Sequence, residues 1–431
     1  MSQVSYPEPL FLTLSNGLKV GLWPLQHLHS VGVGLYCRVG SRYEAPEVSG
    51  ISHFLEHILF RGNAHYATSY AMNRDFESWG GSINGYTTRE YTYFYGRVHP
   101  TFCKEALSFM AELGREPRFS EVETERAIIL EERLEDVDED GLDIDIDDIS
   151  WRSYWGDHPL AQKIIGTPQA LRSITEAQLR EHFARFFCGE NLAVCVTGRF
   201  EVDEIMPVLE AEFGSLPKGQ RISAAPVPRP FAPQQQPAFV THDDTQIALQ
   251  LSFPGPGPKD PDYPAFLLLE RILDDGMSSR LWRRIVEEMG LCYDLWAQLD
   301  VNYDFCMLEI GAQVATEKAV QLVETLYQEL ILLRDQGPTD DELALARRRL
   351  RFGREFALDQ SETMNEYLGV AILYENYVPI EIRLRQLEAV STEDMKAFLR
   401  NLLSKNTQLF AAIGSLTKGL KKRLRESMDV L

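Results

Sequence analysis

Apolar and polar positions along the chain recur with two different periods, and the period predicts the element. Segments with a period near two predict strands, and longer segments with a period near 3.6 predict helices. Asn16-Gly17 lies between two apolar runs and indicates a hairpin, whereas Gly80-Gly81 ends a helical segment. The pattern predicts a hairpin at 10–24, a strand at 30–39, helices within 50–62 and at 69–79, a hairpin at 82–98, helices at 101–114, 121–135 and 175–187, and a strand at 192–197.

A proline-rich segment interrupts the pattern at residues 223–237. It is poor in apolar periodicity and has the composition of a semi-rigid linker. We therefore expect an N-terminal domain at 1–222 and a C-terminal domain at 238–431.

The second domain repeats the pattern of the first. Each half alternates strands with long helices, and those at 317–335 and 339–358 are the longest. This repetition predicts an α+β fold with two homologous domains, each a mostly antiparallel sheet with helices packed on one face. The corresponding segments are 30–38 with 246–253, 53–62 with 267–276, and 125–132 with 342–349.

Composition limits the class of protein. The 431 residues are 44% hydrophobic, as in a globular protein, and too many for one core. The net charge of −21 makes nucleic acid an improbable partner, because phosphate binding needs clustered Lys and Arg. No apolar run is long enough to span a bilayer, and the six cysteines form no CxxC pair. We expect a soluble, cytoplasmic protein without disulfides that is not secreted and does not bind membranes.

The candidate chemistry lies in the helix predicted within residues 50–62. His53 and His57 are one helical turn apart and project from one face, with Glu56 beside them and Ser52 as the expected N-cap. Two neutral imidazoles in this arrangement can hold zinc, and a carboxylate that is not a ligand can accept a proton from water. By itself, the HxxEH motif is equally compatible with two buried histidines that bind backbone carbonyls.

Such a zinc site requires a third protein ligand from another helix. The helix predicted at 121–135 is rich in glutamate, and Glu125 and Glu132 lie two turns apart on one of its faces. Glu132 is our candidate for the ligand and Glu125 for a supporting carboxylate. From the residues alone, Glu125, Glu131, Glu132 and Glu135 remain nearly equivalent choices.

The acidic segment that follows, residues 136–148, begins like a calcium-binding EF-hand loop. Its twelfth position is Asp147 instead of glutamate, the usually apolar eighth position is Asp143, and no clear helix pair flanks it. A solvated acidic loop is therefore the favoured interpretation.

Taken together, these motifs resemble the pitrilysin, insulinase and mitochondrial processing peptidase superfamily, in its bacterial form of about 430 residues. The resemblance extends over nearly the whole chain and is more specific than the five-residue motif. It is carried by Thr13-Leu-Ser-Asn-Gly-Leu-Lys19, Gly40-Ser-Arg-Tyr-Glu44, Gly50 to Gly62, Ile83-Asn-Gly-Tyr-Thr87, Glu125 to Arg133, Ile165-Gly-Thr167 and Gly276-Met-Ser-Ser-Arg-Leu281.

The resemblance implies a zinc endopeptidase that cleaves peptides or small unfolded proteins in a closed chamber. It implies zinc ligands His53, His57 and Glu132, the general base Glu56, and Glu125 as a supporting carboxylate. It also implies an exposed edge strand to which an extended peptide adds as a further strand. The residues of that strand are Asn84, Gly85, Tyr86 and Thr87, and Gly85 stands where the family often has alanine.

One position departs from the family pattern. Members that bind substrate through the second half carry an arginine seven residues before a tyrosine, and here Tyr293 is present but Val286 replaces the arginine. The resemblance to two-subunit bacterial members therefore implies a homologous partner subunit that supplies the arginine. We expect a heterodimer more than a homodimer.

A different class of function is a non-catalytic scaffold or assembly subunit of the same fold. Relatives of that kind usually lose the metal residues, whereas this chain keeps all of them. A nucleophile enzyme has no support, because neither a GxSxG motif nor a histidine-paired cysteine pattern occurs.

Overall fold

The computed structural model describes residues 6–404 and 406–428. The chain forms two compact units, and the first comprises residues up to Arg133, 162–225 and 354–379. The second comprises 134–161, 226–353 and the residues from Ile380 onward. The chain thus passes from the first unit to the second inside the expected linker, but 134–161 and 354–379 each join the unit formed mainly by the other half of the sequence.

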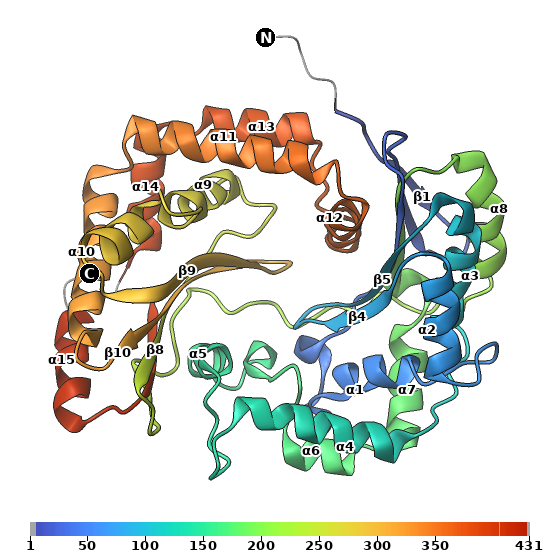
Figure 1. The fold of residues 1–431 in the computed structure, drawn as a ribbon, viewed down its shortest axis with the longest axis horizontal. Coiled ribbons are helices and arrows are strands. Elements are labelled where there is room, and N and C mark those ends of the chain that lie inside the picture. The colour runs from blue at the N-terminus through green and yellow to red at the C-terminus, as the bar shows by residue number, and fades with distance from the viewer. Residues whose placement is uncertain (1–5, 405, 429–431) are drawn as a thin grey trace. The chain divides into compact units, whose positions relative to one another are not determined.

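The first unit is built on a six-stranded sheet, of which Figure 1 labels β1, β4 and β5. The strand order is β1-β2-β6-β3-β5-β4. All neighbours are antiparallel except β2 and β6. The strand β4 forms one edge, as the family resemblance implies. The strands are β1 (Leu10–Thr13), β2 (Lys19–Pro24), β3 (Val31–Cys37), β4 (Ile83–Thr87), β5 (Thr92–Val98) and β6 (Leu192–Gly198).

One face of this sheet carries the apolar core. Val31, Val33 and Leu35 alternate along β3 and pack with apolar side chains of the helices, so they form the face of the strand that joins this core. The helices of the unit are α1 (Ile51–Leu59), α2 (Ser69–Ser78), α3 (Cys103–Leu113), α4 (Val122–Glu132), α6 (Pro168–Ser173), α7 (Glu176–Phe186), α8 (Val202–Phe213) and α12 (Ser361–Tyr374).

Helix α12 covers the opposite face of the same sheet, packing across β2, β6, β3 and β5. The residues of β3 that point to it are Gly32, Gly34 and Tyr36. A Cβ on Gly34 would lie 2.3 Å from Asn365 Oδ1, so glycine is what permits this approach. Asn365 donates hydrogen bonds to the carbonyls of Gly32 and Cys195 at 3.0 and 2.9 Å. The Asn365 side chain of α12 therefore fastens the helix to backbone carbonyls of the sheet.

The second unit has a five-stranded sheet in the order β7-β11-β8-β10-β9, which is antiparallel apart from the β7–β11 pair. Its strands are β7 (Ala238–Thr241), β8 (Gln246–Gly255), β9 (Cys292–Val301), β10 (Cys306–Ala315) and β11 (Leu409–Gly414). Its helices are α5 (Ile146–Trp155), α9 (Tyr263–Leu273), a π-helix (Trp282–Glu288), α10 (Ala319–Gln336), α11 (Asp340–Ala357, which ends in the first unit), α13 (Ile380–Ala389), α14 (Thr392–Leu402) and α15 (Lys418–Met428).

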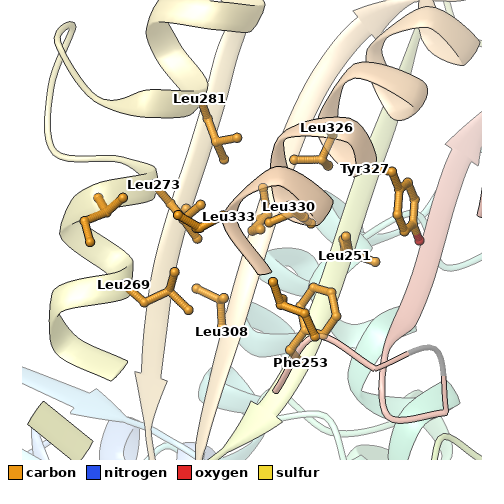
Figure 2. Close-up of a cluster of buried hydrophobic side chains, with 14 of the residues drawn as sticks. Leu251, Phe253, Leu269, Leu273, Leu281, Leu308, Leu326, Tyr327, Leu330 and Leu333 are labelled. Atoms are coloured by element: carbon orange, nitrogen blue, oxygen red, sulfur yellow. The ribbon is translucent and has the colours of Figure 1, made fainter. Parts of the chain in front are cut away.

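Leucine dominates the core of the second unit. Leu251 and Phe253 of β8 and Leu308 of β10 meet side chains of α9 and α10, among them Leu269 and Leu330 (Figure 2). On the opposite face of this sheet, α5 supplies Ile149, Trp151, Tyr154 and Trp155. Glu309 is buried there and accepts a hydrogen bond from Trp151 Nε1 at 2.9 Å.

The two sheets correspond strand by strand once β1 is set aside. The order β2-β6-β3-β5-β4 matches β7-β11-β8-β10-β9, including the single parallel pair. The predicted α+β class and the two homologous domains are thereby confirmed. Beyond that expectation, each sheet also carries a helix on its second face, and this helix comes from the other half of the sequence.

Candidate metal centre

Helix α1 places both histidines of the HxxEH motif on one side, toward α4. The imidazole rings lie 4.7 Å apart and nearly perpendicular to each other. The apolar residues Phe54, Leu55 and Ile58 are buried on the rest of the helix and fix its rotation. The spacing of the motif therefore produces the predicted pair.

The start of α1 differs from expectation. Gly50 is the N-cap, with a φ of 92°, and the Glu44 carboxylate accepts hydrogen bonds from the amides of Gly50 and Ser52 at 2.6 and 2.8 Å. The Ser52 hydroxyl instead lies 3.1 Å from His182 Nε2. Burial raises the pKa of Glu44 to about 7, although the two amide hydrogen bonds oppose the shift. Sequence reasoning assigned no role to Glu44.

Glu132 ends α4 and faces both imidazoles. Its Oε1 lies 3.7 Å from His53 Nε2 and its Oε2 lies 3.7 Å from His57 Nε2. Within the described part of the chain, the three residues form the group whose donor atoms converge within 4.8 Å, as one metal ion requires. Glu132 is thus singled out from the four glutamates that the sequence left open.

Glu125, two turns earlier on α4, is buried and lies behind His57. Its Oε2 is 2.9 Å from His57 Nδ1, and its Oε1 accepts hydrogen bonds from the Arg61 guanidinium. Burial opposes ionisation of Glu125, but His57 and Arg61 outweigh it and lower its pKa. Glu125, the candidate supporting carboxylate, is thus in hydrogen-bond contact with His57, and Arg61 is a further partner that the sequence did not suggest.

The two histidines differ in electrostatic environment. Burial, assisted by His57, lowers the pKa of His53 to about 3 and keeps that ring neutral. Burial also disfavours charge on His57, but the hydrogen bond that its Nδ1–H donates to Glu125 and the nearby carboxylates raise the pKa of His57 above its ordinary value. A raised pKa favours the protonated ring, so protons compete with a metal for His57.

Glu56 is buried between α1 and the edge strand β4. Thr87 Oγ1 donates a hydrogen bond to its Oε2 at 2.6 Å, and a Cβ on Gly85 would lie 2.8 Å from its Oε1. Burial raises the pKa of Glu56 despite the hydrogen bond from Thr87. The carboxylate is thus held within reach of both the candidate ligands and the strand edge.

The predicted substrate strand is only partly exposed. Asn84 and Tyr86 are exposed on one face, Gly85 is half-buried, and the Thr87 side chain is buried against Glu56. Tyr293 lies in the second unit on β9 and is 89% exposed. Val286 lies in the π-helix before it, where Arg284 pairs with Glu288 at 2.7 Å.

In the second unit an ion-pair cluster replaces the metal residues. Arg271 and Arg349, at the positions of His57 and Glu132, both bind Asp275. Leu267 takes the place of His53 in the core. The repeat therefore retains the architecture without the donor atoms.

Comparisons with known proteins find relatives along nearly the whole chain. The insulinase family (peptidase family M16) matches residues 25–167, and the peptidase M16 inactive domain matches residues 173–350. A Mycobacterium tuberculosis protein named an uncharacterized zinc protease is 31% identical over 413 residues, covering 92% of this chain and 91% of its own length.

The chain belongs to the insulinase family. A Bacillus subtilis member, also named an uncharacterized zinc protease, is 26% identical and covers 92% of the chain and 96% of its own length. The crystal structure of a protease from Helicobacter pylori has the same fold, with a TM-score of 0.85 at 20% identity over 95% of this chain and all of that one. No helix within residues 6–404 and 406–428 has the length and apolarity needed to cross a bilayer.

Proposed function

We propose that this insulinase-family protein is a zinc-dependent endopeptidase. The observation that carries the proposal is the convergence of two imidazole nitrogens and the Glu132 carboxylate beside a buried glutamate and a free strand edge. The relatives named zinc proteases support it.

The donor set fits zinc. Neutral imidazole nitrogens and a carboxylate oxygen are ordinary zinc ligands, and a tetrahedral site with bonds of about 2.0–2.1 Å keeps its ligand atoms roughly 3.4 Å apart. The separations of 3.7 Å to Glu132 are close to that value. A zinc ion held by His53, His57 and Glu132 would polarise a peptide carbonyl and make water more acidic.

Glu56 is the general base in this proposal. Its raised pKa makes it a better proton acceptor, and Thr87 holds the carboxylate in one orientation. Glu56 Oε1 takes a proton from the attacking water and returns it to the amine nitrogen of the leaving peptide. Glu125 accepts a hydrogen bond from His57 Nδ1–H and so favours the tautomer that is protonated on Nδ1. The unprotonated Nε2 of this tautomer faces Glu132.

The substrate adds to β4 as an extended strand. The free edge of β4 offers backbone donors and acceptors, and Gly85 brings that edge close to Glu56. Main-chain pairing gives affinity for many sequences, which suits peptides and small unfolded proteins.

A homologous partner subunit completes the enzyme. The side chain of Val286 has no donor to offer a peptide carbonyl, and Arg284, two residues earlier, is paired with Glu288. Tyr293 is exposed and available to substrate. Purification of the chain from its native host should yield a second, related chain in equal amount, whereas recovery of this chain alone argues for a homodimer or a monomer.

The decisive experiment compares two glutamate variants. Glu56→Gln should retain zinc and lose cleavage of an unstructured peptide, because only the proton acceptor is removed. Glu132→Gln should lose both. Glu131→Gln changes an exposed neighbour on α4 and serves as the control. Undiminished cleavage by Glu56→Gln would exclude the assigned role.

The alternative function is a non-catalytic scaffold subunit, favoured by the match of residues 173–350 to the peptidase M16 inactive domain. That match covers β6 and much of the second unit, where Arg271 and Arg349 replace metal ligands. Wild-type protein that binds zinc but cleaves no peptide, alone or with its partner, would support this alternative.

A further inference from the structure

A cluster of tyrosines lies on the face of the first sheet opposite α1. Tyr93 on β5 is its centre, with the rings of Tyr36, Tyr86, Tyr91 and Tyr95 at centroid distances of 4.9–5.9 Å. The function proposed above uses the other face of β4, toward Glu56, and leaves this cluster without a role.

Part of the cluster borders the free edge. Asn84 and Tyr86 of β4 pair with Tyr95 and Tyr93 of β5, so the four side chains share one face. Tyr86 is 57% exposed at the edge itself. A strand added to β4 would therefore direct every second side chain to the face that carries Tyr86, and the residue paired with Tyr86 would lie beside its ring.

Glu366 gives this surface its charge. It projects from α12, is exposed, and accepts a hydrogen bond from the Tyr93 hydroxyl at 3.4 Å. Its charge raises the pKa of both Tyr93 and Tyr95, after burial as the main cause. Glu362 and Glu56 also act on Tyr95, and Glu362 pairs with Arg97 at 3.3 Å. Across the described residues, Glu366 has no basic partner.

We propose that Tyr86 and Glu366 form a subsite that selects extended peptides with lysine or arginine at the positions facing the tyrosines. This inference rests on the proposed peptidase function. A long basic side chain lies over the Tyr86 ring, and its charged end reaches the Glu366 carboxylate. An acidic side chain is repelled there, and a wholly apolar one removes water from Glu366 without replacing it.

Alternation along the strand makes the proposal testable. Two quenched fluorescent peptides carry lysine at either the odd or the even positions around one cleavage site, and two partners carry norleucine instead. We expect lysine to raise kcat/KM about fivefold relative to norleucine in only one of the two placements, odd or even. This is the gain expected for a cation near both an aromatic ring and a carboxylate. Glu366→Gln should abolish this preference, and Tyr86→Leu should reduce it. Glu105→Gln, an exposed change on α3, should not alter it.

A binding measurement separates this inference from the peptidase function. In the Glu56→Gln background, the same peptides are titrated by fluorescence anisotropy, and the ratio of Kd values for norleucine and lysine should again be about five. If the wild type cleaves no peptide, the proposed peptidase function is wrong. The ratio of Kd values then decides by itself whether the subsite binds basic side chains. Equal Kd values, no binding, or a lysine preference that survives Glu366→Gln would each overturn the subsite.

Discussion

Glu125 shows how strongly the candidate centre depends on a side chain outside the ligand set. It is buried, holds His57 Nδ1, and is itself held by Arg61. Removal of such a carboxylate leaves the imidazole free to rotate and to adopt the wrong tautomer.

Glu125→Ala should therefore lower zinc affinity about 10- to 100-fold, measured by competition with a chromogenic chelator. Glu123→Ala is the matched control, because its side chain is 82% exposed on the same helix. Equal zinc affinity in the two variants would contradict the positioning role of Glu125.

Glu44 makes a second prediction, which concerns stability and pH. Its folded-state pKa of about 7 lies above the ordinary 4.5, so the folded protein binds this proton more tightly than the unfolded chain does. The contribution of Glu44 protonation to the free energy of unfolding is fully present below about pH 4.5 and is lost as the pH rises through about 7. Its upper bound is about 3 kcal/mol.

Glu44→Gln, which cannot ionise, should gain in melting temperature relative to the wild type as the pH rises from 4.5 to 7, with no further gain above that range. Thermal unfolding of both proteins at a series of pH values measures this difference. A constant difference across the series would show that Glu44 stays charged in the folded protein.

Helix α12 and the glycines of β3 make a prediction about packing. Gly34→Ala would place a Cβ 2.3 Å from Asn365 Oδ1, and should destabilise the protein by about 1–3 kcal/mol in urea unfolding. Gly353→Ala, an exposed position in α11 with no atom within 4 Å of its Cβ, should be neutral or slightly stabilising. Similar effects of the two substitutions would mean that α12 does not pack tightly on β3.

The same glycines show where sequence reasoning succeeded and where it stopped. The apolar run of β3 and the apolar residues of α1 predicted both elements within a few residues, because local patterns report which segments are buried. Gly32 and Gly34 have no apolar side chains, so the sequence pattern did not indicate that the second face of the sheet is buried. The helix that covers this face, α12, lies more than 300 residues later in the chain. Glu44 was missed for the same reason, since its partners are backbone amides that any sequence has.

The division of the chain into two compact units follows from these coverings. Residues 134–161 supply α5 to the second unit, and 354–379 supply α12 to the first. Each sheet has two faces to bury, and its own half of the sequence provides helices for one of them. The proline-rich composition of 223–237 indicated where the chain passes from one unit to the other. The composition of 134–161 and 354–379 did not indicate that these segments join the other unit.

The repeat also predicts how much metal the molecule holds. Where the first unit has His57 and Glu132, the second has Arg271 and Arg349. The guanidinium groups of these arginines bind Asp275 and offer no donor atom to a metal ion. These arginines outweigh burial and lower the pKa of Asp275, and their positive charges stand where the first unit has metal-binding donors. Purified protein should therefore contain a single zinc ion per chain by elemental analysis.

Substitution at the two corresponding positions tests that asymmetry. Glu132→Gln should remove the zinc and leave the second unit unchanged, whereas Arg349→Gln should keep the zinc and cost about 1 kcal/mol of stability, because Asp275 loses a partner. If Arg349→Gln also lost its zinc, the centre would depend on the second unit in a way that the donor atoms do not explain. Retention of zinc by Glu132→Gln would instead remove that residue from the ligand set, since no other glutamate of α4 converges with both imidazoles among the described residues.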